Sequence, residues 1–263
     1  MKAHVLEAAV LISVVADSSA NAADLQQPFI VPEAKPASSD GSTFAASPYF
    51  WAAGIFGDVG QFGLPAVHME SDFGDILKDL DFGFMAVGEA RHGRFSVFGD
   101  VIYTKVSSGA ATPLGIVAGR VDATSETFAG LVGAGYAVFQ DGRSTIDVVA
   151  GARLWHASTE ISFSGGLLYG VSGSDGATWV DVMACFRGRY FLTDSLYLSA
   201  WGPVGGRTGG PRLGSRRRRV GYEFNDKISA VAGYRALGVD YSNDGFVFDV
   251  VQQGPILGLV LRF

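Results

Sequence analysis

The chain has 263 residues, of which 48% are hydrophobic, 12% aromatic and 17% charged, and its formal net charge is -6. This acidic balance gives no basis for expecting nucleic-acid binding, and the single cysteine excludes an internal disulfide. No apolar run reaches the roughly 20 residues that a membrane-spanning helix needs. The hydrophobic residues are instead dispersed among 36 glycines, as in strands that keep one face in lipid and the other in a lumen.

Residues 1–22 have the pattern of an export signal, because an apolar stretch over residues 5–16 is followed by the small residues of Ala20–Ala22. Glu7 interrupts that stretch, and an N-terminal amphipathic helix is the alternative. Residues 23–43 are rich in Pro, Ser and Ala. Such a segment cannot bury enough apolar surface to fold alone, so we expect it to be a disordered periplasmic leader.

From about residue 43 onward, apolar and polar residues alternate in long runs that turn residues separate, which is the pattern of β-strands. The expected runs are 45–58, 82–92, 94–108, 119–139, 144–164, 176–192, 195–208, 214–224, 227–243 and 246–263. Short joints alternate with mostly longer ones, an asymmetry typical of transmembrane barrels. The sequence therefore predicts an all-β fold over residues 44–263: a transmembrane antiparallel up-and-down β-barrel of about ten strands, with eight or twelve as alternatives.

Charged residues within these runs share one strand face, which we assign to the lumen because side chains alternate along a strand. The expected lumen residues are Glu89, Arg91, Asp100, Asp147, Arg153, Asp181, Arg187, Arg189, Arg235 and Arg262. Opposite charges can pair there, where an isolated charge would be costly. The network is either a selective polar pore or a set of contacts that fills and stiffens a narrow barrel, since barrels of this size have little free space inside.

A short helix is predicted within the first long loop, residues 59–81. Phe73, Ile76 and Leu77 follow helical spacing, and Asp72 can cap the first turn. The nearby carboxylates raise the question of calcium, but they lack the spacing and the glycine of a calcium-binding loop. These carboxylates belong to Asp72, Asp75, Asp79 and Asp81. We therefore expect no metal and no cofactor.

Aromatic residues near strand ends predict two interfacial girdles. Tyr49 and Trp51 open the first strand, and the other expected members are Tyr103, Tyr190, Phe224 and Tyr241.

The last residues, Gly254–Phe263, form the expected closing strand, whose leucines alternate with Gly258, Val260 and Arg262. The alternative is a terminal edge strand of a soluble sheet. The pattern resembles the C-terminal signal that outer-membrane barrels present to their assembly machinery, with Gly258, Leu261 and Phe263 as its members. It departs from that signal at Ile256, where a polar residue is common, and at Leu261, where an aromatic residue is common.

Further motifs recur in order along the chain. They are Tyr49-Phe50-Trp51 with Gly54 and Gly57, Asp75-Ile76-Leu77, Glu89-Ala90-Arg91, Asp100 to Tyr103, Trp179-Val180-Asp181, Gly233-Tyr234-Arg235 with Asp240-Tyr241, and Gly254-Pro255 with Phe263. The series resembles a family of Gram-negative, mainly alphaproteobacterial, porin-like outer-membrane β-barrel proteins. The resemblance implies an integral outer-membrane location with both termini periplasmic, contact with outer-membrane lipids and lipopolysaccharide, and handling by the barrel assembly machinery. It implies no reaction.

The segment Arg207–Arg219 does not fit the barrel pattern, because it is rich in Arg, Gly and Pro. Alternation places Arg216 and Arg218 on the lipid side with Val220, where an Arg costs about 2–4 kcal/mol at the bilayer midplane. Three interpretations stay open: a basic patch that binds lipopolysaccharide phosphates, an anion-selective constriction, and a compensated frameshift in the gene.

These features predict a non-enzymatic barrel with a structural, surface-interaction or minor small-solute transport role. Surface contacts would use the loops 59–81 and 165–175; the second loop is either an exposed apolar tip or folded over the lumen. The alternative is an outer-membrane lipid A or phospholipid hydrolase that uses His156, Ser158 and Glu160. Alternation places these three residues on the outward face, as a polar strand end above the membrane.

Overall fold

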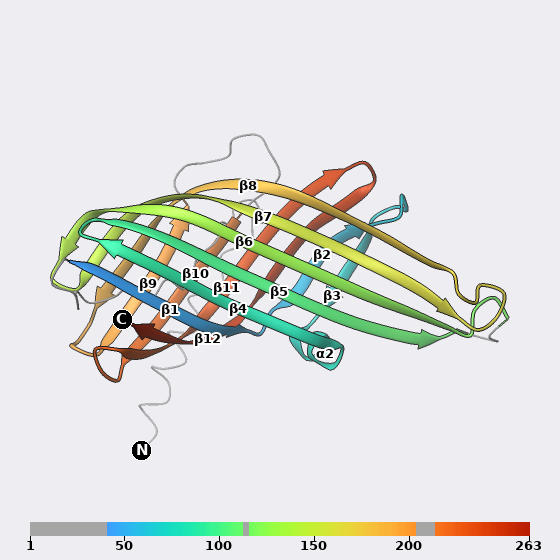
Figure 1. Cartoon of the computed structure of the whole chain (residues 1–263), viewed down its shortest axis with the longest axis horizontal. Helices are drawn as coiled ribbons and strands as arrows, with labels where there is room; N and C mark the ends of the chain where they lie inside the picture. The colour runs from blue at the N-terminus through green and yellow to red at the C-terminus, as the bar shows by residue number, and fades with distance from the viewer. Residues whose placement is uncertain (1–40, 113–115, 204–213) are drawn as a thin grey trace, which may run out of the picture.

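The computed structural model describes residues 41–112, 116–203 and 214–263, apart from the side chains of residues 203 and 214–217. Within these residues the chain forms twelve antiparallel strands and one short helix (Figure 1). The elements are β1 (Ser42–Trp51), β2 (Gly54–Gly60), β3 (Val67–Ser71), α2 (Phe73–Lys78), β4 (Leu80–His92), β5 (Phe95–Ala111), β6 (Arg120–Asp141), β7 (Ser144–Ser164), β8 (Ser172–Phe191), β9 (Leu196–Pro203), β10 (Gly214–Glu223), β11 (Ile228–Asn243) and β12 (Phe246–Arg262). The expected signal peptide and most of the expected leader lie outside the described residues.

The strands close into a ring. β1 pairs with β4, neighbours then pair in chain order from β4 to β12, and β12 pairs again with β1. β2 pairs with β12 outside this closed order, and β3 pairs with β2, so ten of the twelve strands form the ring. The predicted all-β up-and-down barrel of about ten strands, with a short helix in its first long loop, is confirmed.

Ring closure brings the first and last strands together, with Tyr49 opposite Gly258. β2 then continues along the first half of β12. Between β1 and β2 the chain turns aside, and the backbone N–H of Ala52 donates to the carbonyl of Pro255 at 2.9 Å. A Cβ at Gly254 would lie 1.8 Å from the carbonyl oxygen of Ala52, so only glycine permits this approach of two backbones.

The two ends of the barrel differ. The terminal end holds Ser42, Arg262 and the short turns after β4, β6, β8 and β10. At the far end, β5 to β8 run on beyond most of the other strands (Figure 1). We call this extension the projecting sheet; it comprises residues 105–111, 120–126, 156–164 and 172–178. Its four strands are 17, 22, 21 and 20 residues long.

The outer face of the ring carries a continuous apolar band. Exposed members of the band include Phe44, Phe50, Phe84, Val97, Val132, Ile146, Val148, Leu154, Val180, Val182, Phe186, Tyr234, Leu257 and Leu259. On β7 the band runs from Ile146 to Leu154, which is about 27 Å along the strand at ~3.4 Å per residue. A tilt of about 40° reduces this to a height of roughly 20 Å, close to the ~25 Å apolar band of transmembrane barrels.

All four tryptophans of the chain face the lumen, at positions 51, 155, 179 and 201. The prediction that Tyr49 and Trp51 belong to an interfacial girdle is therefore wrong, because they are only 8% and 3% exposed. They share the inward face of β1, while Phe50 points outward. Tyr241 also belongs inside, since its ring stacks on Trp179.

The first long connection contains more structure than predicted. The expected loop 59–81 holds the end of β2 and also β3, which pairs with β2 as a hairpin. The helix follows as expected, and the Asp72 side chain accepts a hydrogen bond from the Asp75 backbone N–H at 2.9 Å. Asp75 also accepts from the Lys78 ammonium at 2.7 Å, and this contact raises the pKa of Lys78. Among the described residues, no three His, Cys, Asp or Glu side chains gather as a metal site.

No helix in the described part of the chain is long and apolar enough to cross a membrane.

Candidate functional site

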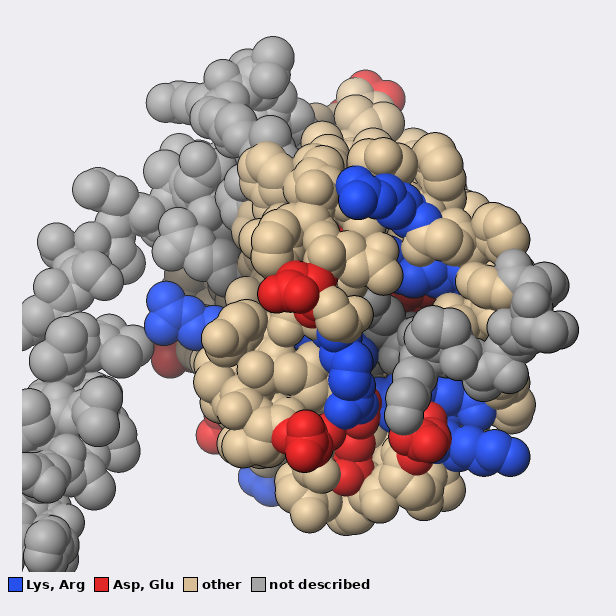
Figure 2. Space-filling model, turned by 90° about the vertical axis from the view of Figure 1, so that its left-hand side faces the viewer, with Lys and Arg blue, Asp and Glu red and all other residues tan. Residues whose placement is uncertain are grey.

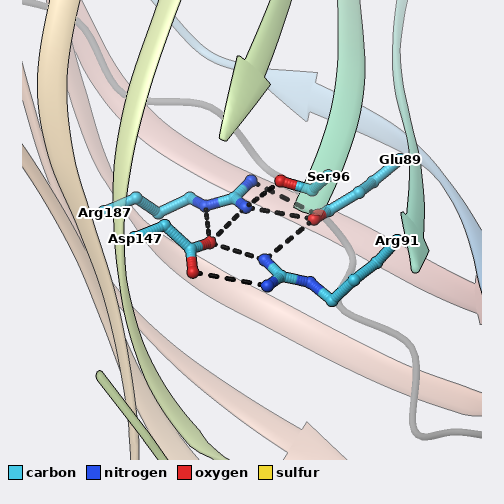
Figure 3. A network of polar contacts seen from close by, with 5 residues as sticks. All are labelled: Glu89, Arg91, Ser96, Asp147 and Arg187. Carbon is cyan, nitrogen blue, oxygen red and sulfur yellow. Dashed lines mark hydrogen bonds and ion pairs between the residues drawn. The ribbon is translucent and has the colours of Figure 1, made fainter. Parts of the chain in front are cut away.

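The lumen near the terminal end is filled by a buried charge network of Glu89, Arg91, Asp147 and Arg187 (Figure 3). Arg91 donates to Asp147 at 2.5 Å and to Glu89 at 3.1 Å. Arg187 donates to Asp147 at 3.0 Å and to Glu89 at 3.0 Å. It also donates to the Ser96 hydroxyl at 3.2 Å. The two guanidinium groups and two carboxylates thus balance in charge and bridge β4, β7 and β8.

The local strand geometry explains this arrangement. Glu89 and Arg91 lie two residues apart on β4, so they share its inward face. Asp147 and Arg187 are direct partners in the register of β7 and β8. The four side chains are only 1–11% exposed. Charged groups that lined a water-filled channel would be far more exposed, so the lumen is packed at this level.

A second buried cluster joins Tyr49, Asp100 and Arg235. The Tyr49 hydroxyl donates to Asp100 at 2.7 Å, and Arg235 donates to the Tyr49 oxygen at 2.8 Å. Arg235 is fully buried, and its guanidinium lies 4.4 Å from the ring centroid of Trp51, where a cation–π attraction adds to the hydrogen bonds. This cluster ties β1, β5 and β11 together across the lumen.

A third group of charges closes the terminal end itself. Arg262 forms an ion pair with Glu223 at 2.9 Å and donates to Ser229 at 2.9 Å. Arg143 forms a second ion pair with Glu223 and donates to the Asp194 carbonyl at 2.6 Å. Figure 2 shows this end of the molecule, where positive and negative side chains lie next to one another.

An aromatic layer lies on the far-end side of the charges. Trp155 and Trp179 stack with 5.8 Å between ring centroids, and Trp179 stacks on Tyr241 at 4.3 Å, both at an angle of 11°. Phe248 packs against Trp179 at 6.1 Å. The layer therefore spans the lumen from β7 and β8 to β11 and β12.

Beside this layer, a cavity of about 560 Å³ opens between β1 to β7, β12 and helix α2. Most of its wall is apolar. Its inward-facing members include Trp51, Ile55, Met85, Ile102, Trp155 and Phe248. A cavity of this size and character is typical of sites for small apolar ligands.

Comparison with protein-family models and with curated protein sequences gives no match. Solved structures give distant matches. Outer membrane protease OmpT from Escherichia coli is 10% identical, with 86% of this chain and 98% of that chain covered and a TM-score of 0.48. The attachment invasion locus protein Ail of Yersinia pestis is 11% identical, with 85% and 99% covered and a TM-score of 0.34. Neisserial surface protein A is 14% identical, with 85% and 97% covered and a TM-score of 0.30.

The lumen residues expected from the sequence fall into the groups described above, with three further members. Arg153 lies opposite Asp181 in the register of β7 and β8, and its guanidinium lies 5.5 Å from the Trp155 ring centroid. Arg189 lies 4.7 Å from the ring centroid of Tyr197. Sequence reasoning missed Tyr49, Ser96, Arg143, Arg219 and Glu223. Alternation could have placed Tyr49 and Glu223 inside, because their strand neighbours Phe50 and Tyr222 point outward.

The residues of the expected assembly signal lie at the ring closure. Phe263 is 68% exposed at the terminal end, and its backbone N–H donates to the Phe44 carbonyl at 2.9 Å. Leu261 faces outward. Gly258 lies against Tyr49, where an added Cβ would come within 3.0 Å of the Tyr49 Cβ. Their role in assembly stays a prediction.

His156, Ser158 and Glu160 lie on the outer face of β7, beyond the apolar band. The ring Nδ1 of His156 lies 2.8 Å from the Thr178 hydroxyl on β8. The three residues belong to the projecting sheet; Ser158 borders the lumen cavity, whereas His156 and Glu160 do not line it. Hydrolysis at this position stays a prediction.

Only part of the Arg-rich segment falls within the described residues. Arg218 is exposed on the outer face of β10 beside Val220, as alternation predicts. Arg219 points inward and is 8% exposed. The side chain of Arg216 and the residues before β10 lie outside the described part of the chain.

Proposed function

We propose that the protein is an integral, non-enzymatic barrel of the Gram-negative outer membrane that acts at the cell surface and does not conduct solutes. In this proposal the terminal end faces the periplasm, and the projecting sheet faces the medium. The observation that carries the proposal is the packed lumen, where four charged side chains of the network are only 1–11% exposed. The apolar band supports membrane integration. Lipopolysaccharide and the barrel assembly machinery stay the expected partners.

The projecting sheet supplies the surface for such a role. Its tip joins two hairpins, because the backbone N–H groups of Leu167 and Leu168 donate to the carbonyls of Ile116 and Val117 at 3.1 and 2.8 Å. Leu167 and Tyr169 are 81% and 77% exposed. Exposed apolar patches beyond the membrane mark interaction sites. We therefore assign the surface contact to this tip.

Planar bilayers test the closed lumen. The folded wild-type protein should produce no lasting conductance above that of the empty bilayer, because paired charges and stacked rings occupy the lumen. A stable ohmic conductance would contradict the proposal and would favour the transport role.

Cysteine labelling in intact cells tests the orientation. Tyr169→Cys at the tip should react with a membrane-impermeant maleimide, whereas the matched variant Lys227→Cys, in an exposed turn at the terminal end, should react only after lysis. The native Cys185 is buried at 1% exposure, so the wild type gives the background. The opposite labelling pattern would mean that the barrel has the reverse orientation in the membrane, and it would contradict the surface role.

A further inference from the structure

The barrel wall is not paired continuously between β1 and β4. The pairing of these strands ends with Pro48 opposite Ala86. Beyond this point, residues 49–51 pair with β12 and residues 80–85 pair with β5. β3 ends the sheet order and, among the described strands, pairs only with β2. Helix α2 links β3 to β4 beside this interruption (Figure 1).

The lumen cavity reaches the outer surface through this interruption. Phe50 and Trp51 are consecutive residues that point to opposite faces of β1, and both line the cavity. Because the pairing of β1 with β4 ends at Pro48 and Ala86, the wall has a break beyond these residues, and the cavity reaches Phe50 at this break. On the outside, Phe50 packs edge-on against Phe73 of α2, with 5.5 Å between ring centroids. We call this passage the side opening.

The side opening lies at the far-end edge of the apolar band. Phe50 on β1 and Phe84 on β4 flank it, and both are exposed on the lipid-facing side. Lipid chains that contact the band therefore reach the opening directly. An aqueous solute would arrive from the far end instead, past the carboxylates of Asp75 and Asp79, which border the cavity.

We propose that the cavity binds an acyl chain of a bilayer lipid, which enters sideways through the side opening. The inference rests on the proposed membrane integration. Three observations support a lipid chain: the apolar wall, the volume of about 560 Å³ and the continuity with the lipid-facing surface. At the edge, Lys78 pairs with Asp75 and Lys105 pairs with Glu126, so polar groups border the opening where a lipid headgroup would lie.

The tryptophans provide the measurement, because all four face the lumen and Trp51 and Trp155 line the cavity. The protein is reconstituted in phosphatidylcholine vesicles whose acyl chains are dibrominated or unmodified. Bromine quenches tryptophan on close contact, so chain entry should quench up to roughly half of the wild-type emission, that of two tryptophans out of four.

Two glycines of β4 offer a matched pair of variants. Gly83 lines the cavity, and an added Cβ would meet nothing closer than 3.8 Å. Gly88 points outward, and its added Cβ would meet nothing closer than 3.9 Å. Gly83→Phe should remove most of the quenching, whereas Gly88→Phe should behave as the wild type. Thr104→Phe, on the cavity wall of β5, repeats the block at a second position.

The outcomes separate the possibilities. Equal quenching in the wild type, Gly83→Phe and Thr104→Phe overturns the proposal. Quenching by a water-soluble brominated alcohol in unmodified vesicles, with none from brominated lipid, overturns entry from the bilayer. Heat-modifiable gel migration and protection from trypsin are measured first on the same vesicles. If the wild type shows neither heat-modifiable migration nor protection from trypsin, the proposed membrane integration is wrong. If the wild type is folded and inserted but is not quenched, only the proposed lipid site is wrong.

Discussion

Replacing Asp147 by Asn would remove a carboxylate that contacts both Arg91 and Arg187. The change keeps the shape of the side chain but leaves Glu89 as the remaining carboxylate of the network for two buried guanidinium groups. Removing one partner of a buried ion pair costs about 3–5 kcal/mol, because the charge that stays behind is desolvated and uncompensated. The Asn oxygen still accepts one hydrogen bond, so we expect the lower end, about 3 kcal/mol.

Urea unfolding of the folded protein in detergent micelles measures this loss. With a slope of about 3 kcal/mol per molar urea, the midpoint should fall by about 1 M. The control is Glu126→Gln, which breaks the half-exposed pair with Lys105 and should cost less than about 1 kcal/mol. Adding Arg187→Met to Asp147→Asn should restore much of the loss, since it rebalances the charge. A midpoint for Asp147→Asn no lower than that of Glu126→Gln would refute the reasoning.

Three further changes test other parts of the barrel. Trp179→Ala should lower the free energy of unfolding by about 3–5 kcal/mol, because it leaves a cavity in the aromatic layer. It should also abolish the near-ultraviolet circular dichroism of the stack with Trp155, and an unchanged spectrum would contradict the stacking. Asp72→Ala should lower the local stability of helix α2 by about 1 kcal/mol, because it removes the N-cap. Hydrogen exchange at the Asp75 amide should become faster, while the urea midpoint of the whole barrel stays unchanged. Phe263→Ala should lower the amount of folded protein in outer membranes while the purified barrel keeps its midpoint, because Phe263 is largely exposed; equal amounts of variant and wild type would exclude an assembly role.

The inward or outward direction of side chains was predictable, because the two-residue period of a strand is a local property. It placed Glu89 and Arg91 on the lumen face, and the same rule applied to β1 would have placed Tyr49 inside. We assigned Tyr49 to an interface because aromatic residues near strand ends resemble a girdle. The error arose from weighing residue type above alternation.

The contacts across the lumen could not be predicted from the sequence. Arg187 and Glu89 lie on strands that are not neighbours, and their contact depends on the curvature of the ring and on the register of every strand between them. The β3 hairpin was missed because its alternation of Val67 and Met69 with polar residues extends over only five residues, all of them at least partly exposed. The side opening follows from the place where the pairing of β1 and β4 ends, which no local pattern reveals.

The closing strand β12 has three pairing partners, namely β1, β2 and β11. Tyr49 and Gly258 are far apart in the chain, so the pairing of β1 with β12 that closes the ring is a contact of high sequence separation. The ring therefore cannot close before β12 is in place. Until β12 arrives, β1 and β11 both present open edges that can pair with other chains. The unsealed barrel is thus the aggregation-prone species of this protein, and its tendency to aggregate should end when the last strand docks.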